Sequence, residues 1–464
     1  ELSSAASDVY KRQPLARTGG MGEAVAGLAK ALAGQGIEVT VAIPRYRHLG
    51  DTGTAAVDAP VPSHRYQLDG FEVLLLDDAE AFDRPGIYGP KPGEAYEDEW
   101  FRWARFSAGV ARLASGFDLV HLHDGHVGPV ALLTSVPTIQ TIHNASYPLL
   151  GPLADAAREL GVSAQDRMLG GALEWYGRAN YLKAGIVGSA RVTTVSPTFA
   201  GQITSDASVS SGLSEVISWL AHPVVGIVNG IDTESWDPQQ DPILAAPFSA
   251  KNLKARKESR AALLEKADLD DGFLIGNVGR MTEQKGLHLI EAGLDRLVQD
   301  GLRMVLVGNG DLDAMIDEWQ SRHPHAVRHF EYSERTARMV YAGADAYYMP
   351  SRFEPCGIGQ LYAMRYGSPP LVHFTGGLAD TVFDLDEDPE QATGLSFRSF
   401  LPEEAVKTVR RAMRVYRKSP KEWKGLQRNG MTRDLSWDHA AHDYLGVYES
   451  ALGVPGSFPA QTPT

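Results

Sequence analysis

The sequence holds one cysteine in 464 residues, which excludes a disulfide framework and a cysteine-rich zinc site and is typical of a reducing compartment such as the cytoplasm. No apolar run approaches the roughly 18–20 residues that span a bilayer, so no membrane partner is expected. Basic residues are in deficit, with 44 Lys and Arg against 58 Asp and Glu and a net charge of −14. This balance argues against a nucleic-acid partner, and an anionic substrate would have to meet local positive charge.

The sequence does contain a repeated alternation of strand-like and helical stretches. Alternation of this kind is typical of parallel, doubly wound sheets, and its repetition on either side of residues 229–238 predicts two Rossmann-like α/β domains. We expect these domains to span 14–228 and 229–435, and residues 436–464 to form a C-terminal helix that returns to the first domain, followed by a mobile tail. The expected strands include Val73–Leu76, Phe117–His121, Thr138–Ile142, Val192–Val195, Val224–Val228, Phe273–Val278, Met304–Val307, Ala346–Met349 and Pro370–His373.

Residues 1–13 differ from the rest of the chain, because they show neither strand alternation nor the apolar segment of a signal peptide. From Pro14 onward the sequence is typical of a phosphate-binding loop and its helix, which normally follow a buried first strand. We therefore interpret residues 1–13 as a segment foreign to the fold that stands where the native strand would be. A native disordered tail is the alternative interpretation.

Two glycine-containing loops carry positive charge at predicted strand ends, where parallel sheets bind their ligands. Arg17-Thr18-Gly19-Gly20 precedes the first helix and combines a cation with backbone amides suited to an anion. The loop 279–286 follows a buried strand and contributes Arg280 and Lys285, which suit a diphosphate whose charge grows as its bond breaks. Each loop is also compatible with an ordinary solvated turn.

Polar side chains follow four other predicted strands. The segment His121–His126 offers three histidines and Asp124, either as metal ligands or, since the chain turns at Gly125, as a polar turn that lines a substrate. His143 and Asn144 follow the next strand and could bind sugar hydroxyls or play a structural role. In the second half, Ser351–Gly357 places Glu354 near a helix start, where a carboxylate is favoured, and Thr375–Leu378 repeats the pattern of glycine turn and helix.

Three Asp-x-Asp triplets, at 268–270, 311–313 and 384–386, are compatible with a metal-bridged sugar nucleotide. Each lies in a charged stretch, so we expect exposed loops there and no metal site.

Taken together, these segments resemble bacterial glycogen synthase and starch synthase, glycosyltransferase family five, from Pro14 to about Leu452, most strongly at Gly276–Gly286 and Ser351–Val382. The resemblance implies the α/β GT-B fold, in which two Rossmann-like doubly wound domains face a deep cleft. It also implies transfer of glucose from ADP-glucose or UDP-glucose to the non-reducing end of an α-1,4-glucan, with retention and with no metal or other cofactor. The expected partners are thus a nucleotide sugar and an α-glucan acceptor.

The resemblance further implies roles for individual residues. Arg280 and Lys285 would hold the donor diphosphate, Glu354 would lie near the transferred glucose, and His143 completes the implied catalytic set. Tyr332 would stack on the base, and Asn229 would mark the crossover between domains. The other implied donor- and sugar-side residues are Arg17, Gly19, Gly20, Glu23, Asp124, Asn144, Cys356, Gly357, Thr375, Gly376 and Gly377.

This sequence departs from the family pattern in three places. Arg17 stands where lysine is usual, and its planar fork differs from a compact ammonium. Gly125 replaces a common tryptophan, which affects the expected acceptor contacts. Tyr362 lies eight residues after Glu354, where related transferases of this fold carry a second glutamate. We therefore favour front-face substitution over double displacement. The rival interpretations are another retaining transferase of the same fold, making sucrose, trehalose or a polysaccharide, and a glucan-binding scaffold without turnover.

Overall fold

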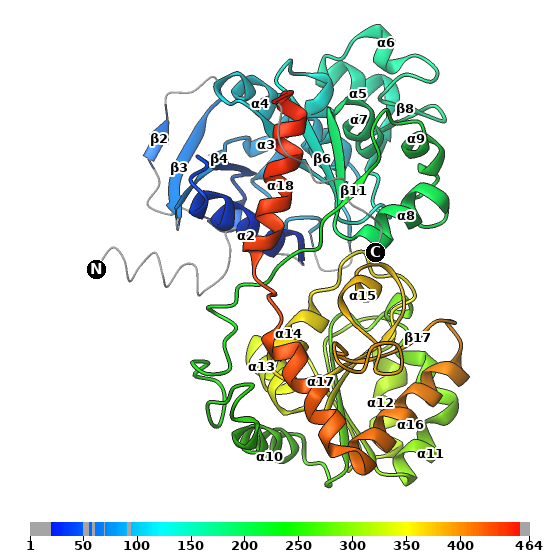
Figure 1. Ribbon diagram of the computed structural model, residues 1–464. Coiled ribbons are helices and arrows are strands. Elements are labelled where there is room, and N and C mark those ends of the chain that lie inside the picture. Colours follow the sequence, from blue (N-terminus) through cyan, green and yellow to red (C-terminus); the bar gives the residue numbers. More distant parts are fainter. Residues whose placement is uncertain (1–19, 50–54, 58–60, 69, 91–93, 455–464) are drawn as a thin grey trace. The chain divides into compact units, whose positions relative to one another are not determined.

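The computed structural model describes residues 20–49, 55–57, 61–68, 70–90 and 94–454, which form two compact α/β units (Figure 1). Unit 1 runs to Gly230 and includes the chain from Trp437 onward, whereas unit 2 comprises Ile231–Ser436. The segment 1–13 and the glycine loop as far as Gly19 lie outside the described residues.

Unit 2 is built on one parallel sheet in the order β14-β13-β12-β15-β16-β17. The order changes direction between β12 and β15, which pair through Ile275 and Ala346. This is the switch point of a doubly wound sheet, where ligands bind beyond the carboxyl ends of the strands. The strands are β12 (Phe273–Val278), β13 (Leu302–Val307), β14 (Val327–Phe330), β15 (Ala346–Met349), β16 (Pro370–His373) and β17 (Leu395–Phe397).

Helices cover both faces of this sheet, because successive strand residues point to opposite sides. Phe273 and Ile275 belong to a core that includes residues of α16 and α17, while Leu274 packs with residues of α10 and α13. The helices are α10 (Arg256–Ala267), α11 (Leu294–Gln299), α12 (Asp313–Arg322), α13 (Glu334–Gly343), α14 (Gly359–Arg365), α15 (Gly376–Thr381), α16 (Pro402–Lys418) and α17 (Pro420–Thr432). Short 3-10 segments lie at Leu253–Ala255, Glu283–Lys285 and Leu287–Gly293.

Helix α16 illustrates how the sequence determines these elements. Pro402 stands in its first turn, where no intrahelical N–H is needed. Glu403 and Glu404 stabilise the helix by interacting with the positive end of its dipole, and Arg417 and Lys418 by interacting with the negative end. Its buried residues recur at intervals of three and four, so one face packs on the sheet.

Unit 1 contains two four-stranded sheets, in the orders β1-β4-β3-β2 and β11-β10-β6-β5, and a small antiparallel sheet, β7-β9-β8. In the first sheet β1 and β4 are parallel and β3 and β2 antiparallel, whereas the second sheet is entirely parallel. The strands are β1 (Thr40–Pro44), β2 (Ala55–Val57), β3 (Ser63–Leu68), β4 (Phe71–Leu76), β5 (Val120–His123), β6 (Thr138–Ile142), β7 (Leu150–Pro152), β8 (Glu174–Trp175), β9 (Arg178–Asn180), β10 (Arg191–Thr194) and β11 (Val225–Gly226).

Strands β1 and β5 each end a sheet, with one edge unpaired among the described residues. In a doubly wound sheet the strand that precedes the first helix lies between these two edges. Here the residues before the first described helix lie outside the described ranges, so the expectation of a lost first strand stays a prediction.

The helices of unit 1 begin with α2 (Gly20–Gly34) and end with α18 (Trp437–Leu452), and these two pack against each other. Leu28 of α2 and Tyr444 of α18 share a core with Ile139 of β6. The other helices are α3 (Ala79–Phe82), α4 (Glu99–Leu113), α5 (Leu153–Leu160), α6 (Ala164–Arg167), α7 (Tyr181–Gly188), α8 (Pro197–Ser205) and α9 (Ser214–Ser218), with 3-10 segments at Arg47–Leu49, Ala114–Gly116 and Gly128–Leu132.

The predicted doubly wound α/β class is confirmed, and four of the predicted strands coincide with β6, β12, β15 and β16. The run Phe117–His121 was placed three residues early, because the strand is β5, Val120–His123, and Phe117 is an exposed turn residue. Strands β3 and β14 were missed, since their sequences, SHRYQL and VRHF, carry too many polar residues to be read as buried strands.

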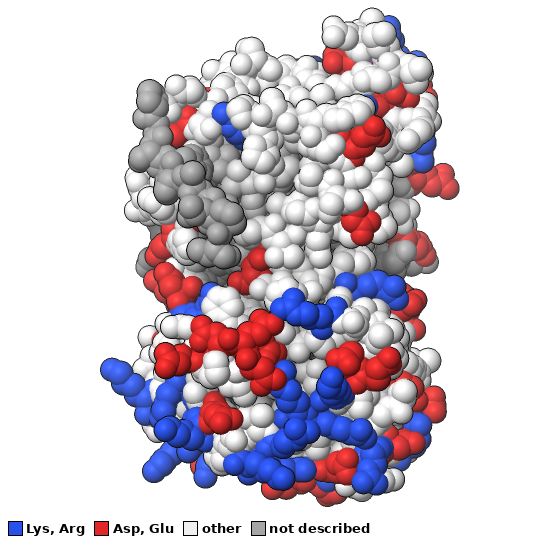
Figure 2. All heavy atoms as spheres, turned by 45° about the vertical axis from the view of Figure 1, so that its right-hand side comes forward, with Lys and Arg blue, Asp and Glu red and all other residues white. Residues whose placement is uncertain are grey.

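No helix among the described residues is long and apolar enough to cross a bilayer. On the face shown in Figure 2, unit 2 carries most of the charged side chains, and many of its basic side chains adjoin one another towards its lower end.

Candidate active site

Lys285 and Glu354 form an ion pair at the switch point of unit 2. Lys285 ends the 3-10 turn that follows β12, and Glu354 lies in the loop that follows the neighbouring strand β15. The Nζ of Lys285 donates to Oε2 of Glu354 at 2.6 Å, and both side chains are largely buried. Parallel pairing of β12 with β15 explains this contact, because it brings two loops 69 residues apart to the same sheet edge.

Backbone and side-chain hydrogen bonds hold the two loops together. The Arg352 N–H donates to the Gln284 carbonyl at 2.8 Å, and Gln284 Nε2 donates to the Phe353 carbonyl at 2.7 Å. The Ser351 hydroxyl donates to Glu354 Oε2 at 2.9 Å. The carboxylate thus accepts from Lys285 of one loop and from Ser351 of the other, and its orientation is determined by both loops.

The glycines Gly376 and Gly377 let helix α15 dock against the Glu354 loop. Gly376 has φ +45, and a Cβ there would lie 2.0 Å from the Glu354 carbonyl oxygen. The Gly377 N–H donates to that same carbonyl at 3.0 Å. Sequence reasoning expected these amides to meet phosphate and sugar, but in this structure the Gly377 amide bonds to the protein. The glycine pair therefore fixes the position of Glu354.

Of the other unit 2 residues predicted for the site, three lie beside the Glu354 loop. Cys356 and Thr375 are buried, and Gly357 has φ +70 and accepts from Gln360 Nε2 through its carbonyl at 3.0 Å. Arg280 and Tyr332 are different, since both are exposed on loops after β12 and β14. The Tyr332 N–H donates to Asn309 Oδ1 at 3.4 Å, which holds its backbone near the end of β13.

A second group of predicted residues comes together in unit 1 around Asp124. Asp124 follows β5 with φ +58, a conformation that aspartate tolerates better than most residues. Its Oδ1 accepts from the backbone N–H groups of His143 and Asn144 at 2.7 and 3.2 Å. Asp124 thus holds the turn after β6, and with it the His143 side chain.

His143 is linked to a row of histidines along β5. Its Nε2 shares a hydrogen bond with His123 Nδ1 at 2.9 Å, and the His123 and His121 rings lie 4.2 Å apart. His121 in turn bonds the Tyr448 hydroxyl of α18 at 2.9 Å and the Thr141 hydroxyl at 2.6 Å. The described residues contain no group of three or more His, Cys, Asp or Glu side chains that could hold a metal ion.

Desolvation keeps these histidines neutral. Burial, with a smaller contribution from His143, lowers the pKa of His121 from 6.5 to about 3. Burial also lowers the pKa of His143 from 6.5, although Asp124 opposes the shift. Burial and the two flanking histidines hold the pKa of His123 well below 6.5.

The histidine row makes the stability of the protein sensitive to acid. Below pH 6.5 these histidines bind protons in the unfolded chain but not in the folded chain. Each of them therefore lowers the free energy of unfolding by up to about 1.4 kcal/mol per pH unit. We expect the melting temperature to fall from about pH 6.5 to about pH 5, and to fall less in His123→Asn. His439, an exposed histidine on α18, supplies the control His439→Asn, which should keep the wild-type slope. Equal slopes for all three proteins would contradict the assignment.

The remaining predicted residues have the following places. Gly20 and Glu23 lie in the first turn of α2, and Asn229 is buried next to the end of unit 1. Arg17 and Gly19 lie outside the described residues. The expectation of exposed Asp-x-Asp loops was wrong for Asp384, which is buried and paired with Arg411.

Sequence reasoning missed Ser351, Gln284 and His123 as supporting residues. Gln284 precedes Lys285 and Ser351 lies three residues before Glu354, but only the structure shows that both support the Glu354 loop. The role of His123 could be recognised only from the register of β5 and β6, in which His123 pairs with Thr141.

The chain is similar to known families and proteins over most of its length. Residues 5–219 match the family model of the starch synthase catalytic domain, and residues 259–427 match that of group 1 glycosyl transferases. The chain is 35% identical over 483 residues to a glycogen synthase of Syntrophotalea carbinolica, covering 97% of this chain and 98% of that protein. It is 37% identical over 480 residues to a glycogen synthase of Alkalilimnicola ehrlichii, covering 96% and 98%.

Among solved structures, the catalytic domain of starch synthase IV from Arabidopsis thaliana, bound to ADP and acarbose, is similar over 94% of this chain and 97% of that one. The TM-score is 0.82 at 29% sequence identity.

Proposed function

The chain belongs to the glycogen and starch synthase family of glycosyltransferases, which have the GT-B fold, and we propose that it extends α-1,4-glucan chains with glucose from ADP-glucose. Its full-length relatives are glycogen synthases, so another retaining transferase or an inactive scaffold is not favoured. We further propose that it acts in the cytoplasm, because one cysteine in 464 residues is typical of reducing compartments.

The contact between Lys285 and Glu354 supports this proposal most directly. A largely buried ammonium at the switch point is a preorganised charge for a departing diphosphate, so less solvent has to rearrange when the bond breaks. Arg280, exposed on the same loop, can add a bidentate contact to the same phosphates. Together the two cations make a site for a dianionic leaving group without a metal ion.

Glu354 is proposed to orient Lys285 and to stabilise the oxocarbenium-like sugar. The bond from the anomeric carbon to the phosphate oxygen breaks while a bond to the acceptor 4-hydroxyl oxygen forms on the same face. The hydroxyl proton passes to the leaving phosphate. Tyr362, at the position of a second glutamate in related transferases, lies in the core with its ring stacked on Trp236 at 3.9 Å, which favours this front-face route.

The donor base and the sugar are assigned by the same reasoning. A solved relative carries ADP, which favours ADP-glucose over UDP-glucose, and the exposed ring of Tyr332 is available to stack on the base. On the unit 1 side, we assign Asp124, His143 and Asn144 to sugar contacts. We assign Asn229 to the crossover, and the loop of Arg17, Gly19, Gly20 and Glu23 to an anionic group. Cys356, Gly357 and Thr375 complete the donor pocket.

A donor competition assay tests the proposal. Purified protein with glycogen and equal concentrations of ADP-glucose and UDP-glucose should release mainly ADP, with glucose incorporated into the glycogen. If an enzyme specific for α-1,4 linkages degrades the labelled product, the transferred glucose has retained its anomeric configuration. Release of UDP in excess would overturn the assignment of ADP-glucose as the donor. Binding of glycogen without release of either nucleotide would overturn the proposal that the protein transfers glucose.

A further inference from the structure

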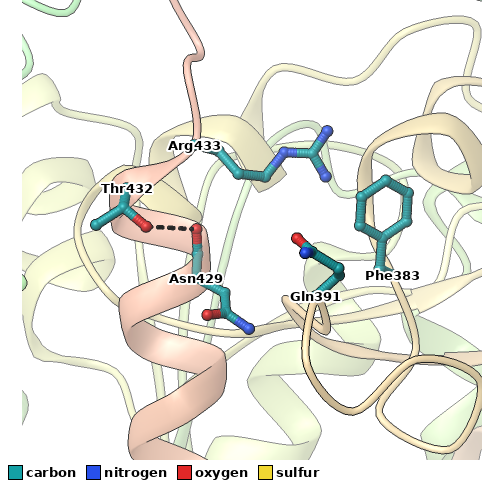
Figure 3. A pocket seen from close by; sticks show the side chains of 5 residues that line it. All are labelled: Phe383, Gln391, Asn429, Thr432 and Arg433. Atoms are coloured by element: carbon teal, nitrogen blue, oxygen red, sulfur yellow. Dashed lines mark hydrogen bonds between the residues drawn. The ribbon is translucent and has the colours of Figure 1, made fainter.

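A separate hollow of about 370 Å³ lies in unit 2 (Figure 3). Phe383 and Gln391, from the segment between α15 and β17, line one side, and Asn429, Thr432 and Arg433, from the end of α17, line the other. None of these residues has a place in the proposed transfer reaction. The volume is at the small end of the range for small-molecule sites, about 300–1,000 Å³.

Arg433 is the unusual member of this group. Its guanidinium lies 4.4 Å from the Phe383 ring centre and donates to the Thr381 carbonyl at 3.3 Å, and desolvation lowers its pKa. Among the described residues it has no carboxylate within 4 Å. Three other arginines of this unit do have one: Arg260 with Asp345, Arg338 with Asp241, and Arg411 with Asp384. Arg256, which is buried, pairs with no carboxylate among the described residues either, but its guanidinium donates to the carbonyls of Tyr366 and Ala344 and to the Ser368 hydroxyl. Arg433 is therefore a desolvated cation with most of its N–H groups unused.

The rest of the lining is neutral and can hydrogen-bond. Asn429 donates its Nδ2 to the carbonyls of Glu390 and Ala392, both at 2.8 Å, which holds the segment around Gln391 against the end of α17. The Gln391 side chain is exposed on the other wall, and the Thr432 hydroxyl, which donates to the Arg428 carbonyl, keeps acceptor capacity. Figure 3 shows these groups around the same hollow.

From this combination we infer that the hollow binds the phosphate ester of a small sugar. The planar fork of Arg433 matches a phosphate in bidentate geometry, while the amides and the hydroxyl match sugar hydroxyls. The Phe383 ring is covered by the guanidinium, so stacking of a nucleobase there is disfavoured. The site stands apart from the donor loop, because Arg433 bonds the last residue of α15 whereas the glycine pair begins that helix, about 8 Å away along its axis.

Calorimetric titration of the full chain with glucose 1-phosphate tests this inference. The experiment is done with saturating ADP, so that the donor site is filled. We expect saturable binding that weakens at least about tenfold in Arg433→Gln and less in Arg433→Lys, which keeps the charge. Arg398→Gln is the matched control, because Arg398 also stacks on a phenylalanine, Phe374 at 4.2 Å, but is paired with Glu387. That variant should bind as wild type does.

Other outcomes overturn the inference in distinguishable ways. Unchanged affinity in a folded Arg433→Gln, or no saturable binding at all, removes the site. Binding that is lost in Arg280→Gln belongs to the donor site. If inorganic phosphate binds as tightly as glucose 1-phosphate, the hollow does not recognise the sugar. If neutral maltose binds as tightly, it does not recognise the phosphate. Failure of the proposed function would appear only as absence of glucose transfer, which this titration does not measure.

Discussion

Replacing Lys285 by alanine is expected to lower kcat at least about a hundredfold, measured as ADP release with glycogen as acceptor. One preorganised donor to a developing oxyanion is worth about 2.7–4 kcal/mol in the transition state, which corresponds to a hundredfold or more. The effect should fall mainly on kcat, because the charge on the leaving phosphate grows as the bond breaks.

The control for this variant is Lys407→Ala, which removes an exposed lysine of α16 from its contact with Glu404 at 3.5 Å. It should turn over at the wild-type rate. A melting curve for Lys285→Ala is needed as well, since loss of Lys285 leaves the Glu354 carboxylate with the Ser351 hydroxyl as its remaining side-chain donor. A folded Lys285→Ala protein with wild-type turnover would falsify the role of the ammonium.

Replacing Glu354 by alanine is expected to lower turnover by a similar factor, at least about a hundredfold. Glu354→Gln keeps the size of the side chain and a hydrogen bond to Lys285 but loses the charge, so it separates orientation from electrostatic stabilisation. If Glu354 acts chiefly by stabilising the positive sugar, the glutamine variant should be almost as slow as the alanine variant. Rescue by glutamine would instead assign Glu354 to positioning.

The double variant Lys285→Ala/Glu354→Ala tests whether the pair acts as a unit. Groups in contact usually give non-additive effects, and these two side chains are 2.6 Å apart. We expect the double variant to be less impaired than the product of the two single losses. Strict additivity would contradict a shared role, since independent residues contribute independently to the barrier.

Sequence reasoning located the strand ends of unit 2 well, because β12, β15 and β16 are short apolar runs bounded by turns. Which strands lie side by side was harder to predict, because β12 and β15 pair although two strands, β13 and β14, and several helices lie between them in the sequence. Their loops meet through sheet order, which no local pattern encodes. The sheet order thus accounts for the ion pair between Lys285 and Glu354.

The burial of polar side chains could not be predicted from the sequence either. Asp384 looked like part of a solvated acidic loop, yet it accepts the Ser396 N–H and pairs with Arg411 of α16. The compensating cation lies 27 residues away, so a window around residue 384 shows only the acidic neighbours. The same limit applies to His123, whose partner His143 is on the neighbouring strand's turn.

The return of α18 to unit 1 has a consequence for synthesis on the ribosome. Leu28 of α2 and Ile139 of β6 are covered by Tyr444, which is translated only after the whole of unit 2. Unit 2 is contiguous and can mature while the nascent polypeptide is still tethered, but the apolar surface of unit 1 must wait for the last helix. A chaperone that shields this surface would have to act across the translation of about two hundred codons.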